Sequence, residues 1–417
     1  MRRHLWLRDS ELERIQNKML TALVTHAYNN VPFYHRTWKA LDLKPRDIKT
    51  SKDLVKLPII KKKDIQKNPR DFLARNIELD KCKKHLTSGS TGSRVIIYCD
   101  QKAEDFRAAV FTRPFLECGL GIRDKAAFIT FVGNFPRRQR WYQLVGFIKR
   151  IYISASTPEE ETLGALSSYK PDMIYSYSSY LHLIAGAMKT VEPESLEPKL
   201  LVGTGELLHN STRSFIESIF GVDMLDFYGS VEVERTAWEC SERAGYHMDV
   251  DSVITEFVKN NEVVAAGERG ELTLTCLHNY AMPLIRYNIE DTGIPTNEKC
   301  PCGRSLPLMK EIEGRSNDYV ILKDGRMISP LGLLNAIWAV SDEMLSEYRI
   351  IQASEDSFII KVIGKKSHSD KITSQIQESM KEIVGKSAKI EVQMVNRIRK
   401  SPSGKTKIVV SKVPRAF

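Results

Sequence analysis

Apolar residues recur with a helical period near the N-terminus and in short, strand-like runs further along the chain. Between residues 10 and 30 the apolar positions are three or four residues apart, at Leu12, Ile15, Met19, Leu20 and Leu23. This spacing predicts an amphipathic helix, which the residues after Asn30 end at a proline. From about residue 85, the expected strands are 95–98, 126–131, 151–154, 173–176 and 200–204, with helices at 179–190 and 211–220. Such alternation favours an α/β core with a largely parallel sheet.

The second half of the chain has a different pattern. Residues 250–330 are rich in alternating and β-branched positions, with strands expected at 262–265, 270–275 and 319–322. The short polar segment 315–319 predicts a hinge, and beyond it strands are expected at 357–363 and 389–395 around a helix at 369–384. We therefore expect two domains. The larger, residues 1–317, is an α/β domain with mostly parallel sheets and a β-rich subdomain, and the smaller, residues 318–417, is an α+β domain.

Composition narrows the class of protein. Of 417 residues, 42% are hydrophobic and 27% charged, which suits a folded chain with a sizeable core. The net charge is +10, but basic and acidic residues are interleaved, which is typical of a solvated surface and predicts no nucleic-acid partner. No apolar run reaches the roughly 20 residues of a membrane span, so we expect no stable membrane insertion. Without a signal core or a disulfide-type cysteine pattern, we expect a cytoplasmic protein.

Five polar segments carry candidate chemistry. The first is a loop of glycines and hydroxyl residues directly before an expected strand: Thr87, Ser88, Gly89, Ser90, Thr91 and Gly92. Small residues let backbone N–H groups approach an anion closely, so the loop suits a triphosphate. It is not a Walker A loop, because no Gly-Lys-Ser/Thr follows. Taken alone, a loop of this kind is more often structural.

The second segment places an aromatic ring, a glycine, a hydroxyl and a carboxylate within residues 227–232. Tyr228 can stack on a planar base, and Glu232 can ligate Mg²⁺. Upstream, Gly205 and Glu206 follow an expected strand end, where open α/β sheets bind ligands. The third segment holds Asp291, a carboxylate that can accept from both hydroxyls of a ribose. A tight turn with a solvated acid is the structural alternative.

The last two segments are 314–318, which contains Arg315, and 400–405, which ends in Lys405. A lysine on a glycine-containing loop can reach a phosphoryl group as a point charge. In order and spacing, the five segments resemble the core motifs of the adenylate-forming superfamily of acyl-CoA synthetases, nonribosomal adenylation domains and luciferases. The likeness covers essentially the whole chain. Segments 27–34 and 57–65 are similar to the phenylacetate–CoA ligase-like branch, which includes capsule-biosynthesis relatives.

This resemblance implies a role for each nucleotide-facing residue. Residues 87–92 would be the phosphate-gripping loop. Gly205 and Glu206 would form the turn that contacts adenine, and Tyr228, followed by Gly229, would pack on the adenine ring.

The remaining roles concern the phosphates, the ribose and the metal. Ser230 would contact phosphate, Glu232 would hold Mg²⁺ and Asp291 would bind the ribose hydroxyls. Arg315 would support ribose or phosphate, and Lys405 would be the adenylation lysine.

Three departures put individual contacts in doubt. The loop ends in Ser93-Arg94, in place of the usual Thr-Pro or Pro-Lys. Val231 stands where many members have Thr, and Asn317 replaces an acid before the expected hinge residue, Asp318. None of these changes removes a charged catalytic group.

The activity implied by the resemblance is an ATP-dependent, AMP-forming ligase. A carboxylic acid would become an acyl-adenylate with release of pyrophosphate, and the acyl group would pass to CoA, a carrier protein or an amine. The small C-terminal domain would be mobile and rotate about the hinge between the two half-reactions. The alternative is a nucleotidyltransferase that adenylylates a hydroxyl acceptor without forming a thioester. The sequence does not identify the acid or the acceptor.

Cys240, His247, Cys300 and Cys302 form a separate constellation. Three thiols and one imidazole complete the closed Cys₃His set of a structural Zn²⁺ site. The Cys-x-Cys spacing is tighter than the usual Cys-x₂-Cys, and four unrelated reduced residues are the alternative. Similar patterns occur in some relatives of the branch. We expect zinc here, and we expect Cys82, Cys99, Cys118 and Cys276 to be core or surface residues.

Aromatic residues indicate where an acyl group would bind. The segment 134–142, with Phe131, Phe135, Trp141 and Tyr142 in or beside it, follows an expected strand and can line a pocket for an aromatic acid. Its arginines also allow contact with a membrane or an acidic carrier protein, and a solvated basic helix is the third interpretation. The other candidates for the pocket are Tyr175, Tyr177 and Tyr180.

Overall fold

The structure is a computed structural model that describes most of the chain. The described residues are 1–87, 95–130, 149–155, 157–189, 196–315, 320–324, 327–328, 333, 337, 345–364, 366–398 and 408–413. Predicted site residues Ser88, Gly89, Ser90, Thr91, Gly92 and Lys405 lie outside them, as does the expected hinge, Asp318. The chain divides into two compact units, one of Met1–Leu208 with Arg213–Ile312 and one of Glu313–Phe417 with His209–Thr212.

The helices follow the apolar periodicity closely. The α-helices are α1 (Asp9–Asn30), α2 (Pro32–Ala40), α3 (Lys62–Lys67), α4 (Gln101–Glu117), α6 (Glu159–Tyr169), α7 (Ser178–Met188), α8 (Asn210–Phe220) and α10 (Ser369–Val384). The short 3₁₀ turns are η1 (Arg2–Trp6), η2 (Pro45–Asp47), η3 (Ser51–Lys56), η4 (Pro69–Phe72), η5 (Leu79–Lys81) and η8 (Lys366–His368). The predicted helices at 10–30, 179–190, 211–220 and 369–384 are therefore present within two residues at each end.

The strands are more numerous than the sequence patterns predict. Those before residue 250 are β1 (Lys83–Leu86), β2 (Ile96–Cys99), β3 (Lys125–Thr130), β4 (Lys149–Ser154), β5 (Met173–Tyr177), β6 (Leu200–Thr204), β7 (Met224–Ser230), β8 (Glu234–Glu239) and β9 (Tyr246–Met248). Those after it are β10 (Val253–Lys259), β11 (Glu262–Val263), β12 (Gly270–Cys276), β13 (Tyr287–Pro295), β14 (Leu308–Arg315), β15 (Val320–Ile321), β16 (Met327–Ile328), β17 (Leu345–Ser354), β18 (Ser357–Gly364), β19 (Lys389–Met394) and β20 (Val409–Ser411).

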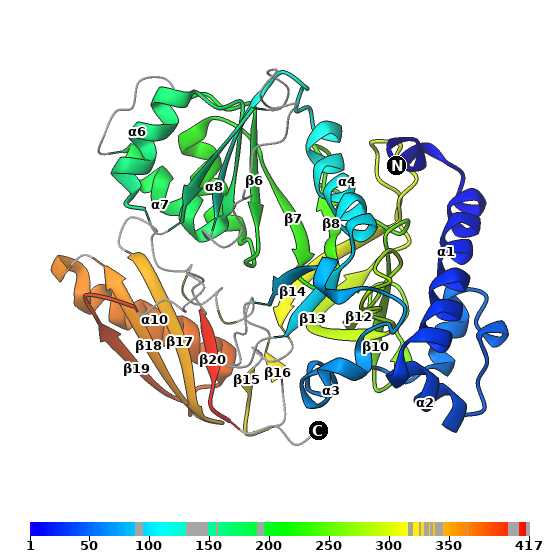
Figure 1. Cartoon of the computed structure of the whole chain (residues 1–417). Coiled ribbons are helices and arrows are strands. Elements are labelled where there is room, and N and C mark those ends of the chain that lie inside the picture. The colour runs from blue at the N-terminus through cyan, green and yellow to red at the C-terminus, as the bar shows by residue number, and fades with distance from the viewer. Residues whose placement is uncertain are drawn as a thin grey trace. The chain divides into compact units, whose positions relative to one another are not determined.

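One long sheet organises the first unit (Figure 1). Its order among the described strands is β11-β10-β12-β13-β14-β9-β8-β7-β6-β5-β3-β4. The strands β4, β3, β5, β6 and β7 run parallel, whereas β7 pairs with β8, and β8 with β9, in antiparallel fashion. The predicted α/β class with a β-rich subdomain is confirmed, and β7 is the strand at which the sheet changes from parallel to antiparallel.

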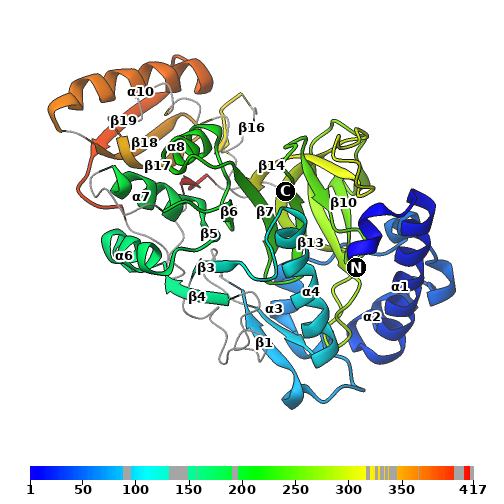
Figure 2. The same ribbon diagram turned by 90° about the horizontal axis from the view of Figure 1, so that it is seen from above.

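Helices cover both faces of the parallel half. Residues that alternate along β3 point to opposite faces. Ala127 and Ile129 share a core with residues of α6, α7 and α8, whereas Ala126 and Phe128 share a core with Phe115 of α4. Figure 2, a view from above, shows α6 and α7 on one side of β5 and β6 and α4 on the other. The carboxyl ends of the parallel strands therefore lie along one edge of the sheet between two helix-covered faces, which is where open α/β sheets usually bind ligands.

The β-rich half is covered by α1. Leu20, Leu23 and Ala27 of this helix are buried in the same core as Leu272 and Leu274 of β12. Their spacing of three and four residues puts them on one face of the helix. The predicted amphipathic helix thus buries its apolar face on strands that lie some 250 residues further along the chain.

The second unit contains a smaller sheet of order β19-β18-β17-β20. Ile372, Ile376 and Met380 of α10, four residues apart, are buried with Phe358 and Ile360 of β18. The strands β17 and β18 are antiparallel, while β18 and β19 are parallel. This is the small α+β unit that the pattern predicts, with β17 as an additional strand. Among the described residues of the whole chain, no helix is long and apolar enough to cross a membrane.

Candidate nucleotide and metal sites

The second segment and the Gly205 turn meet at the carboxyl ends of two neighbouring strands. In the parallel β6–β7 pair, Thr204 lies opposite Phe227, so the next residues, Gly205 and Tyr228, are also neighbours. Gly205 has φ +73°, a left-handed conformation that glycine adopts without strain. The Glu206 carboxylate accepts a hydrogen bond of 3.0 Å from the backbone N–H of Ser179 at the start of α7, which fixes the turn against that helix.

A tyrosine and an aspartate from distant strands form the centre of this site. The hydroxyl of Tyr228, on β7, donates to Oδ2 of Asp291, on β13, over 2.6 Å. In sheet order β13 is four places from β7, which in a flat sheet is about 19 Å at the usual spacing. The sheet must therefore curve strongly to bring the two side chains together. The curvature unites the residue expected to pack on adenine with the residue expected to bind ribose.

The turn between β7 and β8 carries the expected magnesium ligand. Glu232 is half-buried, and its Oε1 lies 3.4 Å from the hydroxyl of Tyr287, a buried residue of β13. Its other oxygen, Oε2, has no hydrogen-bond partner among the described residues. A half-buried carboxylate with an available oxygen fits a hard divalent cation such as Mg²⁺. Tyr287 was part of the third sequence segment but was not recognised as a site residue.

The two residues before this turn have properties that suit a bound anion. A Cβ on Gly229 would lie 2.6 Å from the carbonyl oxygen of Glu234, so only glycine lets β8 approach this closely. The buried Oγ of Ser230 has no hydrogen-bond partner in the structure described here. An unpaired buried hydroxyl is costly unless a ligand pairs with it, which agrees with the phosphate contact expected of Ser230.

The described residues on either side of the glycine-rich segment belong to two paired strands. Strands β1 and β2 are antiparallel, and residues 88–94 connect them. At the base, the N–H of Thr87 donates to the carbonyl of Val95 (3.0 Å), and the N–H of Val95 donates to Oγ1 of Thr87 (2.9 Å). The hydroxyl of Thr87 therefore closes the base of this segment as an acceptor, and its own hydrogen is left for the phosphate contact expected from the sequence.

A charged network ties this hairpin to the Glu232 turn. Glu104 of α4 binds His85 of β1 at 2.5 Å, and one helical turn further Arg107 binds Glu234 at 2.8 Å and the carbonyl of Val231 at 3.3 Å. Burial would raise the pKa of Glu104, but the hydrogen bond from His85 and the ammonium of Lys83 outweigh it and lower the pKa to about 2. Helix α4 thus holds both strand β1, which leads into the glycine-rich segment, and the β7–β8 turn that carries Glu232 (the metal turn).

His85, Cys99 and Glu104 also lie close enough to share a metal ion. The Glu104 carboxylate, however, is already paired with Lys83 at 3.0 Å and with His85. Adding a cation beside Lys83 and Arg107 would be electrostatically unfavourable. We therefore interpret this group as an ion-pair network.

The four predicted zinc ligands converge. The donor atoms of Cys240, His247, Cys300 and Cys302 all lie within 4.8 Å of one another. The sulfurs of Cys240 and Cys300 are 3.6 Å apart, and the sulfur of Cys302 is 3.4 Å from Nε2 of His247. A disulfide needs about 2.05 Å, whereas ligands on a tetrahedral zinc ion are separated by about 3.8 Å (sulfur to sulfur) and about 3.6 Å (sulfur to nitrogen). The spacing fits the expected Zn²⁺.

Protonation states suit metal binding as well. Burial lowers the pKa of His247 to about 4, so the imidazole is neutral at pH 7 and Nε2 can ligate. Burial acts to raise the pKa of the Cys302 thiol, but hydrogen bonds from the Arg304 backbone and from Cys300 reverse the shift and lower it. The remaining cysteines are free and lie outside this group; Cys82, Cys99 and Cys276 are buried and Cys118 is half-buried.

Some predicted residues cannot be placed. The backbone of Arg315 ends β14, but its side chain and the loop around Lys405 lie outside the described residues, as does the aromatic segment 131–142. Of the three tyrosines considered for an acyl pocket, Tyr177 bonds Thr130 and Tyr180 bonds Thr162. Tyr175 differs, because its ring packs edge-on against Phe111 and Phe115 of α4.

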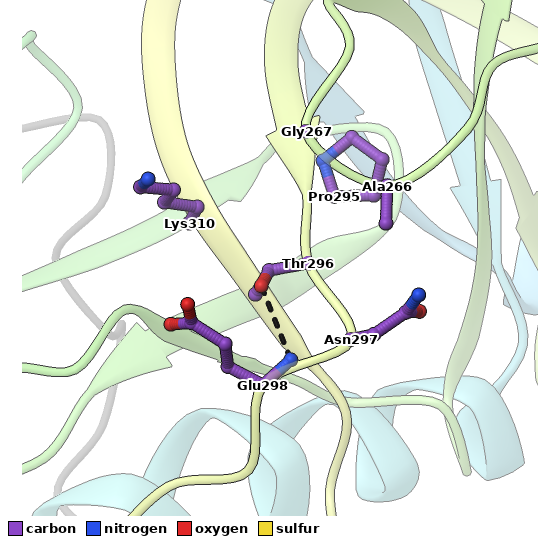
Figure 3. A pocket seen from close by; sticks show the side chains of 7 residues that line it. All are labelled: Ala266, Gly267, Pro295, Thr296, Asn297, Glu298 and Lys310. Carbon is purple, nitrogen blue, oxygen red and sulfur yellow. Dashed lines mark hydrogen bonds between the residues drawn. The ribbon is translucent and has the colours of Figure 1, made fainter.

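A separate hollow on the antiparallel half of the sheet contains none of the nucleotide-site or zinc-site residues described above (Figure 3). Its lining residues are Ala266, Gly267, Pro295, Thr296, Asn297, Glu298 and Lys310. Most of them are exposed, and the lining residues bond to one another: the N–H of Glu298 donates to Oγ1 of Thr296, and the N–H of Gly267 donates to the carbonyl of Pro295. None is a predicted site residue.

Comparison with known proteins places this arrangement in a family. Residues 320–412 match the family model described as the CapK C-terminal domain. The chain is 30% identical to phenylacetate-coenzyme A ligase of Escherichia coli strain K12 over 93% of its length and 91% of the relative, and 27% identical to that of Aromatoleum evansii over 98% and 96%. Protein CapK of Staphylococcus aureus is 23% identical over 97% and 90%.

The fold agrees with these sequence matches. A crystal structure of 2-hydroxyisobutyryl-CoA ligase in the postadenylation state superposes with a TM-score of 0.83, at 21% identity, over 98% of this chain and 91% of that one. The fold is thus that of the adenylate-forming enzymes. Within them, the chain belongs to the phenylacetate–coenzyme A ligase family, in the branch that the sequence resembled, and it is an AMP-forming ligase.

Proposed function

We propose that this ligase activates a carboxylic acid as an acyl-adenylate and then transfers the acyl group to coenzyme A. The observation that carries the proposal is that two distant sequence segments, the one with Tyr228 and Glu232 and the one with Asp291, meet through strand β13. Strand β13 supplies Asp291 to Tyr228 and Tyr287 to Glu232, so the expected adenine, ribose and metal contacts lie within one neighbourhood. Relatives named phenylacetate-coenzyme A ligase, at 25–30% identity, support CoA as the acceptor.

In this proposal the nucleotide lies across the carboxyl ends of β6 and β7. Its base packs against the Tyr228 ring beside Gly205, and its ribose hydroxyls donate to Asp291. The hydroxyl of Tyr228 donates a short hydrogen bond to one oxygen of the Asp291 carboxylate and so fixes the orientation of that carboxylate. The phosphates lie between the loop 88–94, held by its Thr87–Val95 base, and the Ser230 hydroxyl.

In the first half-reaction an oxygen of the acid's carboxylate bonds to the α-phosphorus of ATP. The bond from that phosphorus to the bridging oxygen breaks, and pyrophosphate leaves with the electron pair. The carboxylate is ionised at pH 7 and needs no general base, so the protein's task is positioning and charge neutralisation. Mg²⁺ held by Glu232 would supply part of that neutralisation. Lys405 adds its ammonium charge at the α-phosphate.

The second half-reaction has CoA as the nucleophile. Its thiolate attacks the acyl carbon, and AMP leaves with the shared oxygen. We propose that the unit from residue 318 onward rotates about Asp318 between the two steps, so that Lys405 withdraws and the thiol gains access. The Cys₃His group lies in the first unit, where a bound Zn²⁺ would hold loop 300–305 against β8 and β9 and would serve a structural role.

Pyrophosphate–ATP exchange, measured with neither CoA nor a carrier protein present, tests the activation step. One class of acid among aryl, fatty, amino and hydroxy acids should stimulate exchange, and subsequent CoA should convert the adenylate to a thioester with release of AMP. No exchange with any acid, combined with ATP consumption on addition of a hydroxyl acceptor, would replace the proposal with the nucleotidyltransferase alternative.

A further inference from the structure

The four arginines buried among the described residues are not equally paired. Arg107 binds Glu234 and Arg286 binds Glu256, each within 3.0 Å. Arg113 lies between Asp249 and Asp251. Arg235, on β8 and only 3% exposed, has no carboxylate within ion-pair distance among the described residues. A buried guanidinium without a counter-charge is unfavourable by several kcal/mol, so it needs an explanation.

Aromatic faces surround this guanidinium. Its central carbon lies 4.7 Å from the ring centre of Phe227, 5.4 Å from that of Phe111 and 5.9 Å from that of Phe115. Cation–π attraction offsets part of the desolvation cost, but it supplies no hydrogen-bond acceptor. The buried Nε of Arg235 has no hydrogen-bond partner within the described part of the chain. The phenol of Tyr175 hydrogen-bonds the Arg235 side chain, but it carries no charge at pH 7, because burial raises its pKa, and so it does not neutralise the guanidinium.

The acidic side chains closest to Arg235 are engaged elsewhere. Glu234 is paired with Arg107. The Asp226 carboxyl accepts a hydrogen bond of 2.7 Å from the hydroxyl of Tyr246, and burial raises the pKa of Asp226 to about 7. A carboxyl with a pKa of about 7 is only partly ionised at neutral pH, and it is not within ion-pair distance of Arg235, so it offsets only part of the guanidinium charge. Among the side chains that the structure describes, none gives Arg235 a full and directly paired counter-charge.

The position of Arg235 excludes the nucleotide as its partner. Along β7, Phe227 and Tyr228 point to opposite faces of the sheet. Tyr228 faces Asp291, whereas Phe227 and Arg235 pack with Phe111 and Phe115 of α4. Arg235 also comes three residues after Glu232, in the strand that the metal turn opens. The proposed function puts the reacting carboxylate at that turn, and we infer that the rest of the acid extends along the face on which Arg235 lies.

Contacts along helix α4 indicate the distance between the Glu232 turn and Arg235. Arg107 contacts the metal turn at Val231, and Phe111, one turn along, contacts Arg235. One helical turn advances about 5–6 Å. Solvent also reaches this aromatic cluster, since Phe111, Tyr152 and Tyr175 are half-buried. A group bound to Arg235 would then be separated from the reacting carboxylate by roughly four to five bonds.

We propose that Arg235 is a specificity-determining residue that binds a second carboxylate of the substrate, and that the acid activated by this ligase is a dicarboxylic acid of short chain or of one aromatic ring. The inference rests on the proposed acyl-adenylate chemistry. The substrate supplies the missing counter-charge, in a bidentate pair with the guanidinium, while Phe111, Phe115 and Phe227 surround the adjoining carbons.

The test is pyrophosphate–ATP exchange with matched acids, of which one in each pair has the second carboxylate. The pairs are glutarate with pentanoate and 3-carboxyphenylacetate with phenylacetate. The wild-type enzyme should have a kcat/KM at least about 100-fold higher for one of the diacids than for its partner, because a site built for a charge rejects the analogue without it. Arg235→Met should lower kcat/KM for that diacid about 30-fold to 1,000-fold and reduce the preference, with little change for the monoacid.

Thermal unfolding without substrate separates this role from a structural one. Arg235→Met has similar length and lacks the uncompensated charge, so its midpoint should equal or exceed that of the wild type. The control is Arg113→Met, which breaks a paired buried arginine and should lower the midpoint strongly. A large loss of stability in Arg235→Met, with equal losses of activity toward both acids of each pair, would show that Arg235 is a core residue.

The kinetic outcomes also distinguish this inference from the proposed function. Exchange that is fastest with monoacids, and unaffected in preference by Arg235→Met, would overturn the dicarboxylate assignment and leave acid activation intact. Exchange with none of the acids, mono- or dicarboxylic, would count against both.

Discussion

Two regions of the first unit treat buried polar groups in opposite ways. Around the N-terminal segment η1, charges are compensated by protein. His4 binds Asp251 at 2.7 Å, Asp251 also binds Arg113, and Arg113 reaches Asp249. Around β7 and β8, the described residues leave two buried groups incompletely paired: the hydroxyl of Ser230 has no hydrogen-bond partner, and the guanidinium of Arg235 has no carboxylate partner.

This difference in pairing distinguishes residues that stabilise the fold from residues that are expected to bind a ligand. The N-terminal region also has backbone and ring contacts, for the N–H of Ser305 donates to the carbonyl of Leu5 and Arg304 lies over the ring of Trp6. Substitutions there should cost stability. Around β7 and β8, where a ligand would pair with Ser230 and Arg235, substitutions should lower activity and leave the stability of the fold nearly unchanged.

The largest effect is expected for Lys405→Ala. Removing the ammonium charge from the α-phosphate should lower the rate of acid-dependent pyrophosphate exchange about 10³-fold, with ATP affinity and the unfolding midpoint nearly unchanged. Lys412→Ala, in the same C-terminal segment, is the matched control and should retain activity. Normal exchange by Lys405→Ala would refute the assignment of this lysine.

The next largest effect is expected for the zinc content and the stability of the Cys₃His group. Protein purified without added metal should contain about one zinc per chain, and Cys300→Ser should lose most of it and unfold at a lower temperature, because three ligands bind zinc more weakly than four. Metal analysis and thermal unfolding measure both. Cys118→Ser, which changes a half-buried cysteine outside the group, should keep the metal. A wild-type protein free of zinc would remove this site from the account.

Arg113→Met should show the cost of breaking a compensated buried pair. It leaves Asp249 and Asp251 buried beside one another without their cation, and the expected loss in unfolding free energy is about 3–5 kcal/mol. Urea unfolding at pH 7 measures it. If Arg113→Met and Arg235→Met proved equally destabilising, the proposed contrast between the two regions would fail.

The contribution of Asp226 to the free energy of unfolding should depend on pH, and this dependence tests how the charges around Arg235 are paired. Its pKa is about 7 in the folded protein, above the 3.8 of an exposed aspartate, because of burial and the neighbouring Glu239. Between pH 4 and 7 the unfolded chain ionises first, so this group lowers stability as pH rises. Asp226→Asn should therefore gain stability relative to wild type from pH 4.5 to 7.5, by up to about 4 kcal/mol. A constant difference across that range would mean that Asp226 is ionised throughout and compensates Arg235.

The smallest effect is expected for Tyr228→Phe. The ring remains to pack on adenine, but the hydrogen bond to Asp291 is lost, so KM for ATP should rise about 10-fold with little change in kcat. Steady-state kinetics with ATP as the varied substrate measures the change. An unchanged KM would indicate that Tyr228 does not orient the ribose carboxylate.

Local patterns in the sequence predicted the helices and the parallel strands well. The helix α1 and the strand β6 have apolar positions with regular period, and each is flanked by clear stop residues, so neighbouring residues alone define them. Strands such as β8 and β13 were missed, because they mix charged, glycine and apolar residues and have no simple alternation. Their places depend on long-range pairing, which a single-sequence pattern does not contain.

The candidate site divides in the same way. Tyr228, Glu232 and Asp291 could be found from motif resemblance, but the contact that orients Asp291 depends on the curvature of the sheet. Arg235 could not be found, since an arginine after a carboxylate in a charged stretch is usually solvated. Only the burial of β8 against α4 reveals that this guanidinium packs on aromatic rings and has no carboxylate partner among the described residues.

The most direct test of acyl-adenylate formation is an isotope transfer. The best acid from the exchange panel would be labelled with ¹⁸O in the reacting carboxylate and turned over with ATP and CoA, and the AMP analysed by mass spectrometry. Attack of that carboxylate on the α-phosphorus predicts one ¹⁸O in each AMP released and an acyl-CoA that has lost one labelled oxygen. Thioester formed with unlabelled AMP, or AMP found attached to a hydroxyl acceptor, would contradict the central claim.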